Sequence, residues 1–318
     1  METAQNLAGP SFNGLVHISD VVDEANEIMR KYKSGELYAY ETFSRKLNSK
    51  IVGLYKSDQV VIAARSGVGK SAFSTILLKG LANKYKELVF IYWSWEMKSY
   101  QNVIRMYSAD AKIPVKDLMS AKTPLDDETY ASIVNSAESL RSIPMYFREI
   151  PLDHKKWELM VKEVQRQFPN STIVNLVDHT RLVTSLNERS EEEKITNLML
   201  TGIRVKNETE CINIFLSQLN RKIEDGERDN VGKTGILPSY IFGADSVMQC
   251  ATLVLGLHRP EQYNLSTYKN LDTKNLIVTQ ILKQREGELC EIAMYHNLAT
   301  NTIVDSPEEL IEKKLYKI

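Results

Sequence analysis

Residues 61–73 read VIAARSGVGKSAF, and this stretch decides the class of fold. It contains Gly69-Lys70-Ser71, which closes the G-x-x-x-x-G-K-S/T pattern of a phosphate-binding loop. Ala64 stands where that pattern has its first glycine. The stretch therefore raises the question of whether the loop is intact, decayed, or a variant that marks one kind of nucleotide enzyme.

The residue types of the loop indicate that it is intact. Gly67 and Gly69 can form its sharp curl, because glycine adopts positive φ at little cost. Alanine at position 64 disturbs the loop little if that residue keeps a negative φ. A strand before the loop and a helix after it would direct backbone N–H groups at phosphates. The expected nucleotide contacts are Arg65, Ser66, Gly67, Val68, Gly69, Lys70 at the β- and γ-phosphates, Ser71 at Mg²⁺, and Ala72.

The composition is that of an ordinary globular chain. Of the 318 residues, 43% are hydrophobic and 25% are charged, and the net charge is −1. Near-zero charge argues against a protein coated in positive charge, although a local basic path would suffice for nucleic acid binding. We expect no membrane span and no secretory leader, because neither apolar pattern is present. Cys211, Cys250 and Cys290 form no C-x-x-C pair, so we expect buried thiols and a cytoplasmic location.

Strand-like and helix-like segments alternate after residue 58. Apolar runs favour strands at 59–64, 88–95, 145–150, 172–178, 211–217, 252–258, 275–283 and 289–295. Helical spacing favours helices at 71–84, 97–110, 126–141, 154–168 and 190–207. The predicted fold class is α/β, with a mostly parallel sheet, helices on both faces, and the last two strands as an antiparallel hairpin at its edge.

An amphipathic helix is predicted at residues 18–33, up to a stop at Ser34-Gly35. The pattern alone leaves open whether its apolar stripe packs on its own domain or on a neighbouring subunit. We therefore divide the chain into an N-terminal segment at 1–48, an ATPase-type domain at 49–305 and a tail at 306–318.

Two carboxylates follow predicted strands on the rim that carries the phosphate loop. Asp178 ends TIVNLVD, where it could support Mg²⁺, or could simply cap a turn. Glu96 follows LVFIYWSW, where it could polarise water toward a γ-phosphate, or could be an acid in the first turn of a helix.

Three further residues would, taken alone, be interpreted as ordinary solvent-exposed side chains. Gln218 ends the strand-like run in FLSQLNR, where its amide could sense a γ-phosphate. Lys283 and Arg285 lie in ILKQREG, and they matter only if this hairpin faces a nucleotide on a neighbouring subunit.

Taken together, the ordered series AARSGVGKSAF, WSWEM, IVNLVDH, SQLNR, GADSVMQCATLVLGLHRPE and KQREGE resembles the DnaB-like replicative helicases. In that family the phosphate loop commonly begins with alanine, and S-Q-L-N-R precedes a DNA-facing loop. The resemblance spans about residues 50–297, and SQLNR followed by KQREG is far more specific than the phosphate loop. It implies a RecA-like ATPase domain that uses ATP and Mg²⁺.

The resemblance also implies a role for each matching residue. Lys70 and Ser71 would bind phosphate and Mg²⁺, and Asp178 would support the ion. Glu96 would be the catalytic base and Gln218 the γ-phosphate sensor.

Catalysis would need more than one copy of the chain. Arg285, with Lys283, would enter the active site of the adjacent subunit as an arginine finger. The family analogy makes the assembly a hexameric ring, and the helix at 18–33 then resembles the linker helix that docks on the next subunit. Forked or single-stranded DNA would be the substrate, and a primase or a helicase loader would be a further partner.

The chain departs from the family pattern in several places. Only about 17 residues precede the linker-like helix, so we expect a reduced N-terminus, no primase docking through such a domain, and a viral or mobile-element origin. The usual aspartate–tyrosine–leucine is Asp178-His179-Thr180. None of these departures removes a catalytic group.

Two loops are candidates for gripping the backbone of single-stranded DNA. One follows the 172–178 strand and the other follows Gln218, and a solvated polar loop is the alternative for the second. The expected DNA contacts are Arg189, Arg221, Lys222, Arg228 and Lys233. The competing functions are a RecA-fold ATPase in recombination and an ATP-binding assembly protein that does not hydrolyse its nucleotide.

Overall fold

The structure is a computed structural model that describes residues 15–36, 39–120, 124–220 and 234–312. The chain divides into two compact units, residues 1–40 and 41–318. The small unit contains helix α1 (Ile18–Lys33), which has the bounds predicted from the sequence. The large unit begins before residue 49, because the segment after residue 40 is held to the end of the domain: the Ser44 hydroxyl and the N–H groups of Arg45 and Lys46 all donate to the Asp305 carboxylate.

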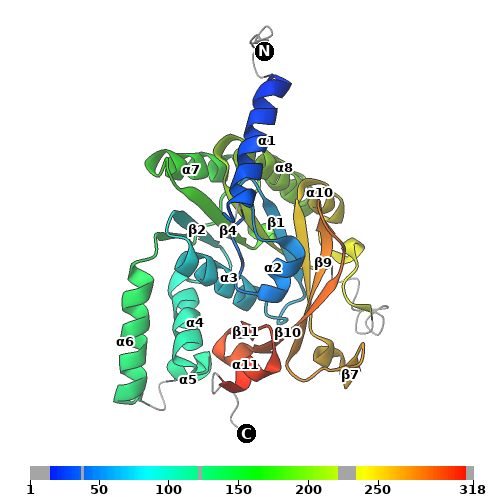
Figure 1. Ribbon diagram of the computed structural model, residues 1–318. Coiled ribbons are helices and arrows are strands. Elements are labelled where there is room, and N and C mark those ends of the chain that lie inside the picture. The colour runs from blue at the N-terminus through cyan, green and yellow to red at the C-terminus, as the bar shows by residue number, and fades with distance from the viewer. Residues whose placement is uncertain (1–14, 37–38, 121–123, 221–233, 313–318) are drawn as a thin grey trace. The chain divides into compact units, whose positions relative to one another are not determined.

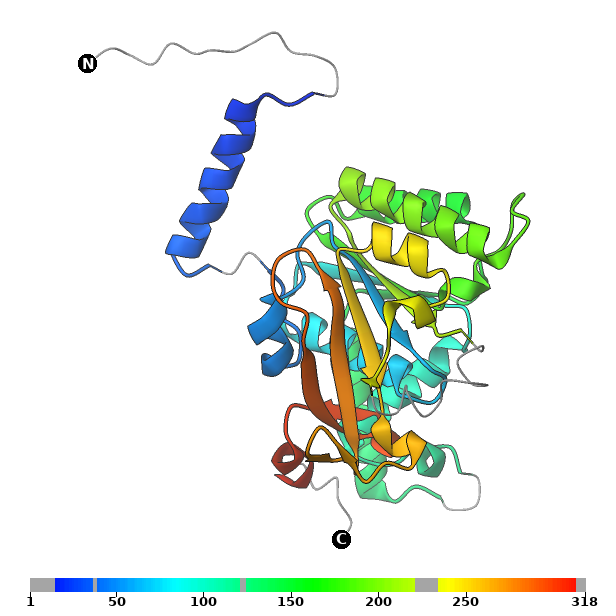
Figure 2. The same ribbon diagram turned by 90° about the vertical axis from the view of Figure 1, so that its right-hand side faces the viewer.

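The large unit is built on a nine-stranded sheet with the order β11-β10-β9-β6-β1-β5-β4-β2-β3 (Figures 1 and 2). Six strands run parallel, and β9, β10 and β11 are antiparallel to their neighbours. The strands are β1 (Gln59–Ala64), β2 (Leu88–Ser94), β3 (Met145–Arg148), β4 (Thr172–Asp178), β5 (Ile212–Gln218), β6 (Leu253–His258), β9 (Leu276–Gln284), β10 (Glu291–Asn297) and β11 (Thr302–Val304). A separate two-stranded ribbon consists of β7 (Thr267–Tyr268) and β8 (Leu271–Asp272).

Helices cover both faces of this sheet, as the alternation of strands and helices predicted. The helices of the large unit are α2 (Arg45–Ile51), α3 (Lys70–Lys84), α4 (Ser99–Ala111), α5 (Val115–Leu118), α6 (Asp127–Arg141), α7 (His154–Gln167), α8 (Glu191–Thr209), α10 (Ala244–Cys250) and α11 (Pro307–Glu312). Short 3-10 turns are η1 (Thr180–Leu182), η3 (Pro238–Tyr240), η4 (Pro260–Tyr263) and η5 (Leu298–Thr300). The fold is therefore the predicted α/β class.

One core layer lies between the sheet and helices α7, α8 and α10. Alternate residues of a strand point to opposite faces, so Val61 and Ala63 of β1 enter this layer. Trp157 of α7 is fully buried there, with its ring centroid 6.2 Å from that of Trp93 and 5.9 Å from that of Phe215. The intervening residues of β1 face the other way, toward α3, so the strand that leads into the phosphate loop is buried on both sides.

Two sequence-based expectations at the C-terminal end differ from the structure. The β9–β10 hairpin is antiparallel as predicted, but it does not form the edge, because the short strand β11 pairs outside β10. Cys211 and Cys250 are buried, whereas Cys290 is only half-buried, so the expectation of a buried thiol was wrong there. Cys290 precedes β10, whose residues alternate between buried and half-buried positions. Within the described ranges, no helix has the length and apolarity that crossing a membrane would need.

The aromatic layer gives a test of the fold. Trp157→Ala should lower the free energy of unfolding by about 3–5 kcal/mol, because it leaves a cavity in a close-packed core. Leu159→Ala is the matched control, since this side chain lies on the same helix and is 66% exposed. Urea unfolding monitored by circular dichroism measures both, and comparable losses in the two variants would contradict the described packing.

Candidate active site

The phosphate loop connects β1 to α3. β1 stays extended to Ala64, which pairs with Gln218 of β5. The curl follows at Gly67 (φ 78°) and Gly69 (φ 115°), and α3 begins at Lys70 with no side-chain cap on its first N–H groups. Uncapped N–H groups at the start of a 15-residue helix form a binding site for an anion. The alanine lies in the strand, before the residues that bend, so the loop is intact.

A second segment, not expected from the sequence, supports the loop from outside. The side chains of Arg259 and Gln262 donate hydrogen bonds to the carbonyl oxygen of Gly67, at 2.9 and 3.2 Å. The Arg65 guanidinium donates to the Tyr263 hydroxyl at 3.3 Å and lies 5.7 Å from the centre of its ring. The η4 turn after β6 therefore holds the shape of the loop.

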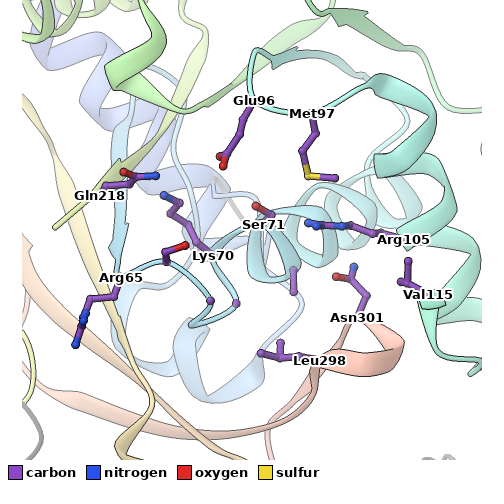
Figure 3. Close-up of a pocket in the computed structure, with 14 residues that line it drawn as sticks. Arg65, Lys70, Ser71, Glu96, Met97, Arg105, Val115, Gln218, Leu298 and Asn301 are labelled. Carbon is purple, nitrogen blue, oxygen red and sulfur yellow. The ribbon is translucent and has the colours of Figure 1, made fainter. Parts of the chain in front are cut away.

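A cavity of about 360 Å³ opens over the loop and the first turn of α3 (Figure 3). Glu96 and Gln218 point into it toward Lys70, from the ends of β2 and β5. The residues that line the cavity are Arg65, Ser66, Gly67, Gly69, Lys70, Ser71, Ala72, Glu96, Met97, Arg105, Val115, Gln218, Leu298 and Asn301. Val68, an expected nucleotide contact, is buried and does not line it.

Asp178 lies beside the loop at the end of β4. Its Oδ2 accepts hydrogen bonds from the hydroxyl groups of Ser71 at 3.4 Å and Tyr92 at 3.3 Å. Burial raises the pKa of Asp178 and lowers the pKa of Lys70, and the attraction between the two groups opposes both changes. The Oδ1 atom of Asp178 is buried and has no hydrogen-bond partner in the described part of the chain. A spare carboxylate oxygen beside a serine hydroxyl suits the all-oxygen shell of Mg²⁺, so these residues fit that ion.

The backbone fixes Glu96 relative to Asp178. In the pairing of β2 with β4, Ser94 lies opposite Asp178. The N–H groups of Trp95 and Glu96 then donate to the carbonyl oxygen of Asp178, at 3.1 and 3.3 Å. The Glu96 side chain is left 49% exposed at the mouth of the cavity, where it can meet both water and a phosphate.

Buried polar side chains hold the turn that carries Glu96. The amide of Asn102 on α4 donates to the Ser94 hydroxyl at 2.7 Å, and this hydroxyl donates to the Met97 carbonyl at 2.6 Å. The Tyr92 hydroxyl donates to the Asn102 amide oxygen at 3.3 Å. The Tyr92 hydroxyl shares its one proton between Asn102 and Asp178, so one network joins Asp178 to the turn that carries Glu96.

His179 lies between Glu96 and Gln218. Its Nε2 is 3.1 Å from the amide nitrogen of Gln218 and 3.7 Å from the Glu96 carboxylate. Burial, with help from the positive charges of Lys70 and Arg181, lowers the pKa of His179 to about 4. The imidazole is therefore neutral near pH 7, and its Nε2 accepts a hydrogen bond from Gln218.

Lys283 and Arg285 lie away from this cavity. Arg285 lines a separate hollow of about 390 Å³ together with Asp58 and Lys206. The Lys283 ammonium donates to the backbone carbonyls of Met248 and Gln249 at the end of α10. Neither residue is among those that surround the chain's own phosphate loop.

The candidate DNA contacts are mostly beyond what the structure describes. Arg189 is exposed just before α8, and its N–H donates to the Glu193 carboxylate at 2.8 Å. Four of the expected contacts lie outside the described residues: Arg221, Lys222, Arg228 and Lys233.

These groups at the carboxyl ends of parallel strands define a P-loop nucleotide-binding domain of the α/β class. Two solved structures share this fold. One, an ATPase domain, superposes with a TM-score of 0.80 and 18% identity, over 91% of this chain and 99% of that one. The other is a DnaB-like replicative helicase solved for its interactions with primase, with a TM-score of 0.77, 18% identity, and coverage of 91% and 67%. The fold is the predicted RecA type.

Sequence comparison then gives the family. The family of the DnaB-like helicase C-terminal domain matches residues 40–305. The chain is 26% identical over 291 residues to the replicative DNA helicase DnaB of Geobacillus stearothermophilus, covering 90% of this chain and 61% of that protein. It is 24% identical over 298 residues to the replicative DNA helicase DnaC of Bacillus subtilis, with coverage of 92% and 62%. The chain belongs to the DnaB-like helicase C-terminal domain family, and it spans about three fifths of the length of these relatives.

Sequence reasoning missed three contributors to the site. Asn102 gave no signal, because a polar residue in a helix is common on any surface. Arg259 lies in the quoted segment GADSVMQCATLVLGLHRPE, but no role was expected for it. His179 did give a signal, since it replaces the tyrosine that usually follows the aspartate in this family, but its contacts with Glu96 and Gln218 were not foreseen.

The pKa of His179 predicts a pH-dependent contribution to stability. The unfolded chain protonates this imidazole below about pH 6.5 and the folded chain only below about 4, so stability falls as pH drops through this window. Because of His179, the free energy of unfolding should be about 1–2 kcal/mol lower at pH 5 than at pH 7. His179→Asn should remove that part of the slope in urea unfolding measured at several pH values.

Gln218→Ala is the control for this measurement. It removes the same hydrogen bond but keeps the imidazole, so it should retain the slope of the wild-type protein. If the free energy of unfolding changed with pH equally in His179→Asn and the wild-type protein, the imidazole would not be held neutral.

Proposed function

We propose that this chain is the motor domain of a replicative DNA helicase, which hydrolyses ATP to move along single-stranded DNA as a ring of identical copies. Family membership supports the class of enzyme, because the relatives carry the name replicative DNA helicase. One observation carries the proposal: Glu96 and Gln218, from the ends of β2 and β5, line the same cavity as Lys70 and Ser71 of α3, and Asp178 at the end of β4 accepts a hydrogen bond from Ser71. A scaffold that only binds ATP needs no such base and sensor.

The geometry divides the reaction among these residues. The N–H groups at the start of α3 and the Lys70 ammonium would bind the phosphates, with the γ-phosphate toward Glu96 and Gln218. Ser71 and Asp178 would hold Mg²⁺, which when bound neutralises charge on the phosphate oxygens. The exposed Glu96 carboxylate would orient the attacking water and accept its proton. Gln218 would exchange its hydrogen bond with His179 for one to the γ-phosphate.

Completion of the site by a second copy is part of the proposal. The cations that line the chain's own cavity are Arg65, Lys70 and Arg105, whereas the candidate finger Arg285 lines another hollow. A neighbouring copy could therefore present Arg285 to this nucleotide, which is why we propose a ring, with six copies by family analogy. We place α1 against the next copy on the same analogy. Single-stranded or forked DNA is the proposed substrate, and a primase or a helicase loader is a further proposed partner.

Unwinding of a forked duplex tests the helicase activity directly. The assembled wild-type protein should separate the strands in the presence of ATP and Mg²⁺. Glu96→Gln should bind ATP normally but lose about 10²–10⁴-fold in turnover, because it lacks the general base. Glu87→Gln, an exposed glutamate just before the same strand, is the matched control. ATP hydrolysis without strand separation by the assembled wild-type protein would refute the helicase proposal.

Mixing of variants tests the contribution of a second copy. Arg285→Ala should bind nucleotide nearly normally and lose about 10³-fold or more in turnover. A mixture with Lys70→Ala should recover part of the ATPase activity, since some interfaces then combine an intact Lys70 with an intact Arg285. Glu286→Ala, next in the chain, should behave as the wild-type protein. Full ATPase activity in a monomer would exclude a finger supplied by another copy.

A further inference from the structure

The peptide group between Gly67 and Val68 is a weak point of the phosphate loop. Gly67 has a φ of 78° and no Cβ atom, so the peptide group after it can rotate in either direction at little cost. In one orientation the Gly67 carbonyl oxygen points away from the cavity. In the other it points at the place of the phosphates and repels them, because only N–H groups attract an anion. The loop therefore needs a group that holds this carbonyl outward.

Arg259 and Gln262 hold the carbonyl in the outward orientation. Their side chains donate to the Gly67 oxygen at 2.9 and 3.2 Å, and neither side chain lines the cavity. The N–H at the other end of the peptide group, on Val68, donates to the Arg65 carbonyl at 3.4 Å. A hydrogen bond from a guanidinium is about twice as strong as one from a neutral amide, so Arg259 is the main support.

Glu261 fixes the guanidinium that makes this contact. Its Oε1 accepts from Nε and Nη2 of Arg259, which leaves Nη1 for Gly67. Its Oε2 accepts from the N–H of Asn275, just before β9, at 3.0 Å, and its Oε1 lies 3.2 Å from Nε2 of the buried His296 in β10. Burial by itself raises the pKa of Glu261, but the hydrogen bonds from Arg259 and Asn275 bring it below its usual range. The carboxylate is therefore charged near pH 7 and is held by two further segments.

We propose that Arg259 locks the peptide group after Gly67 in its phosphate-binding orientation, and that Glu261 is a positioning residue that keeps Arg259 in place. The lock raises affinity because the empty loop already has its bound form. Without it only a fraction of the molecules can bind, and the apparent dissociation constant rises by the inverse of that fraction. The bound state stays the same, so turnover at saturating ATP does not change. This inference rests on the proposed ATPase function, since its ligand is the phosphate chain of the same nucleotide.

Arg259→Lys tests the lock. The guanidinium reaches Glu261 and Gly67 through separate nitrogens in a fixed fork, whereas lysine keeps the charge but has a single nitrogen. Dissociation constants for ATP and inorganic tripolyphosphate are measured on the full chain by displacement of a fluorescent ATP analogue, and both should rise about tenfold or more. KM for ATP should rise with them, whereas kcat at saturating ATP should stay within about twofold.

Glu261→Gln is a second variant, which also decides the inference if Arg259→Lys does not fold. It removes the charge but keeps an oxygen that can accept from Arg259, so both ligands should weaken by a smaller factor of about threefold.

Glu158→Gln is the matched control for the loss of an ion pair. Glu158 of α7 accepts hydrogen bonds from Nε and Nη2 of Arg204 on α8, and neither residue lines the cavity. This variant should keep both dissociation constants within about twofold of those of the wild-type protein.

Three results would overturn the inference. The first is an Arg259→Lys variant that binds both ligands as the wild-type protein does. The second is a fall in kcat with unchanged dissociation constants, which would place Arg259 in the chemical step. The third is equal weakening in Glu158→Gln, because the effect would then follow from the loss of any ion pair. A wild-type chain that binds tripolyphosphate but does not hydrolyse ATP would instead refute the proposed function and leave the lock standing.

Discussion

The register of the central parallel strands is the constraint on which the site depends. Ala64 lies opposite Gln218, and Ser94 lies opposite Asp178, so the strands end level with one another. Hydrogen bonds from the Trp95 and Glu96 backbone N–H groups to the Asp178 carbonyl oxygen extend that alignment one step beyond the sheet. A shift of one residue in either pair would turn these side chains to the other face, away from the phosphate loop.

Desolvation and mutual attraction act in opposite directions on the two buried charged groups beside the phosphate loop. Lys70 and Asp178 are both buried, and burial alone would drive each toward its neutral form. Their mutual attraction opposes this tendency, and the neutral His179 adds no competing charge. The buried Lys70 and Asp178 thus offset each other's charge, and the uncapped N–H groups of α3 remain free for a ligand.

The sequence predicted the strand-end residues because their positions follow from local pattern. Asp178 and Gln218 end apolar runs and Glu96 follows one, and parallel strands bring such ends to one rim. What it could not predict depends on contacts between distant segments. Asn301 lines the nucleotide cavity from far along the chain, and Arg259 supports Gly67 through a contact that its sequence segment does not reveal. β11 has three residues, too few for a period to be recognised.

Strand β10 connects two parts of the molecule that matter for the proposed function. Its seven residues, about 24 Å long, begin near the turn that carries Arg285 and end at Leu298. It pairs with β9 over Glu291–Tyr295 and with β11 over Tyr295–Asn297, so every part of it is hydrogen-bonded to a neighbouring strand. A continuous strand thus connects the nucleotide cavity with the turn that carries Arg285, and a displacement at one end would be passed to the other. In a ring, successive sites would be coupled by the rigidity of one strand, without a flexible joint between them.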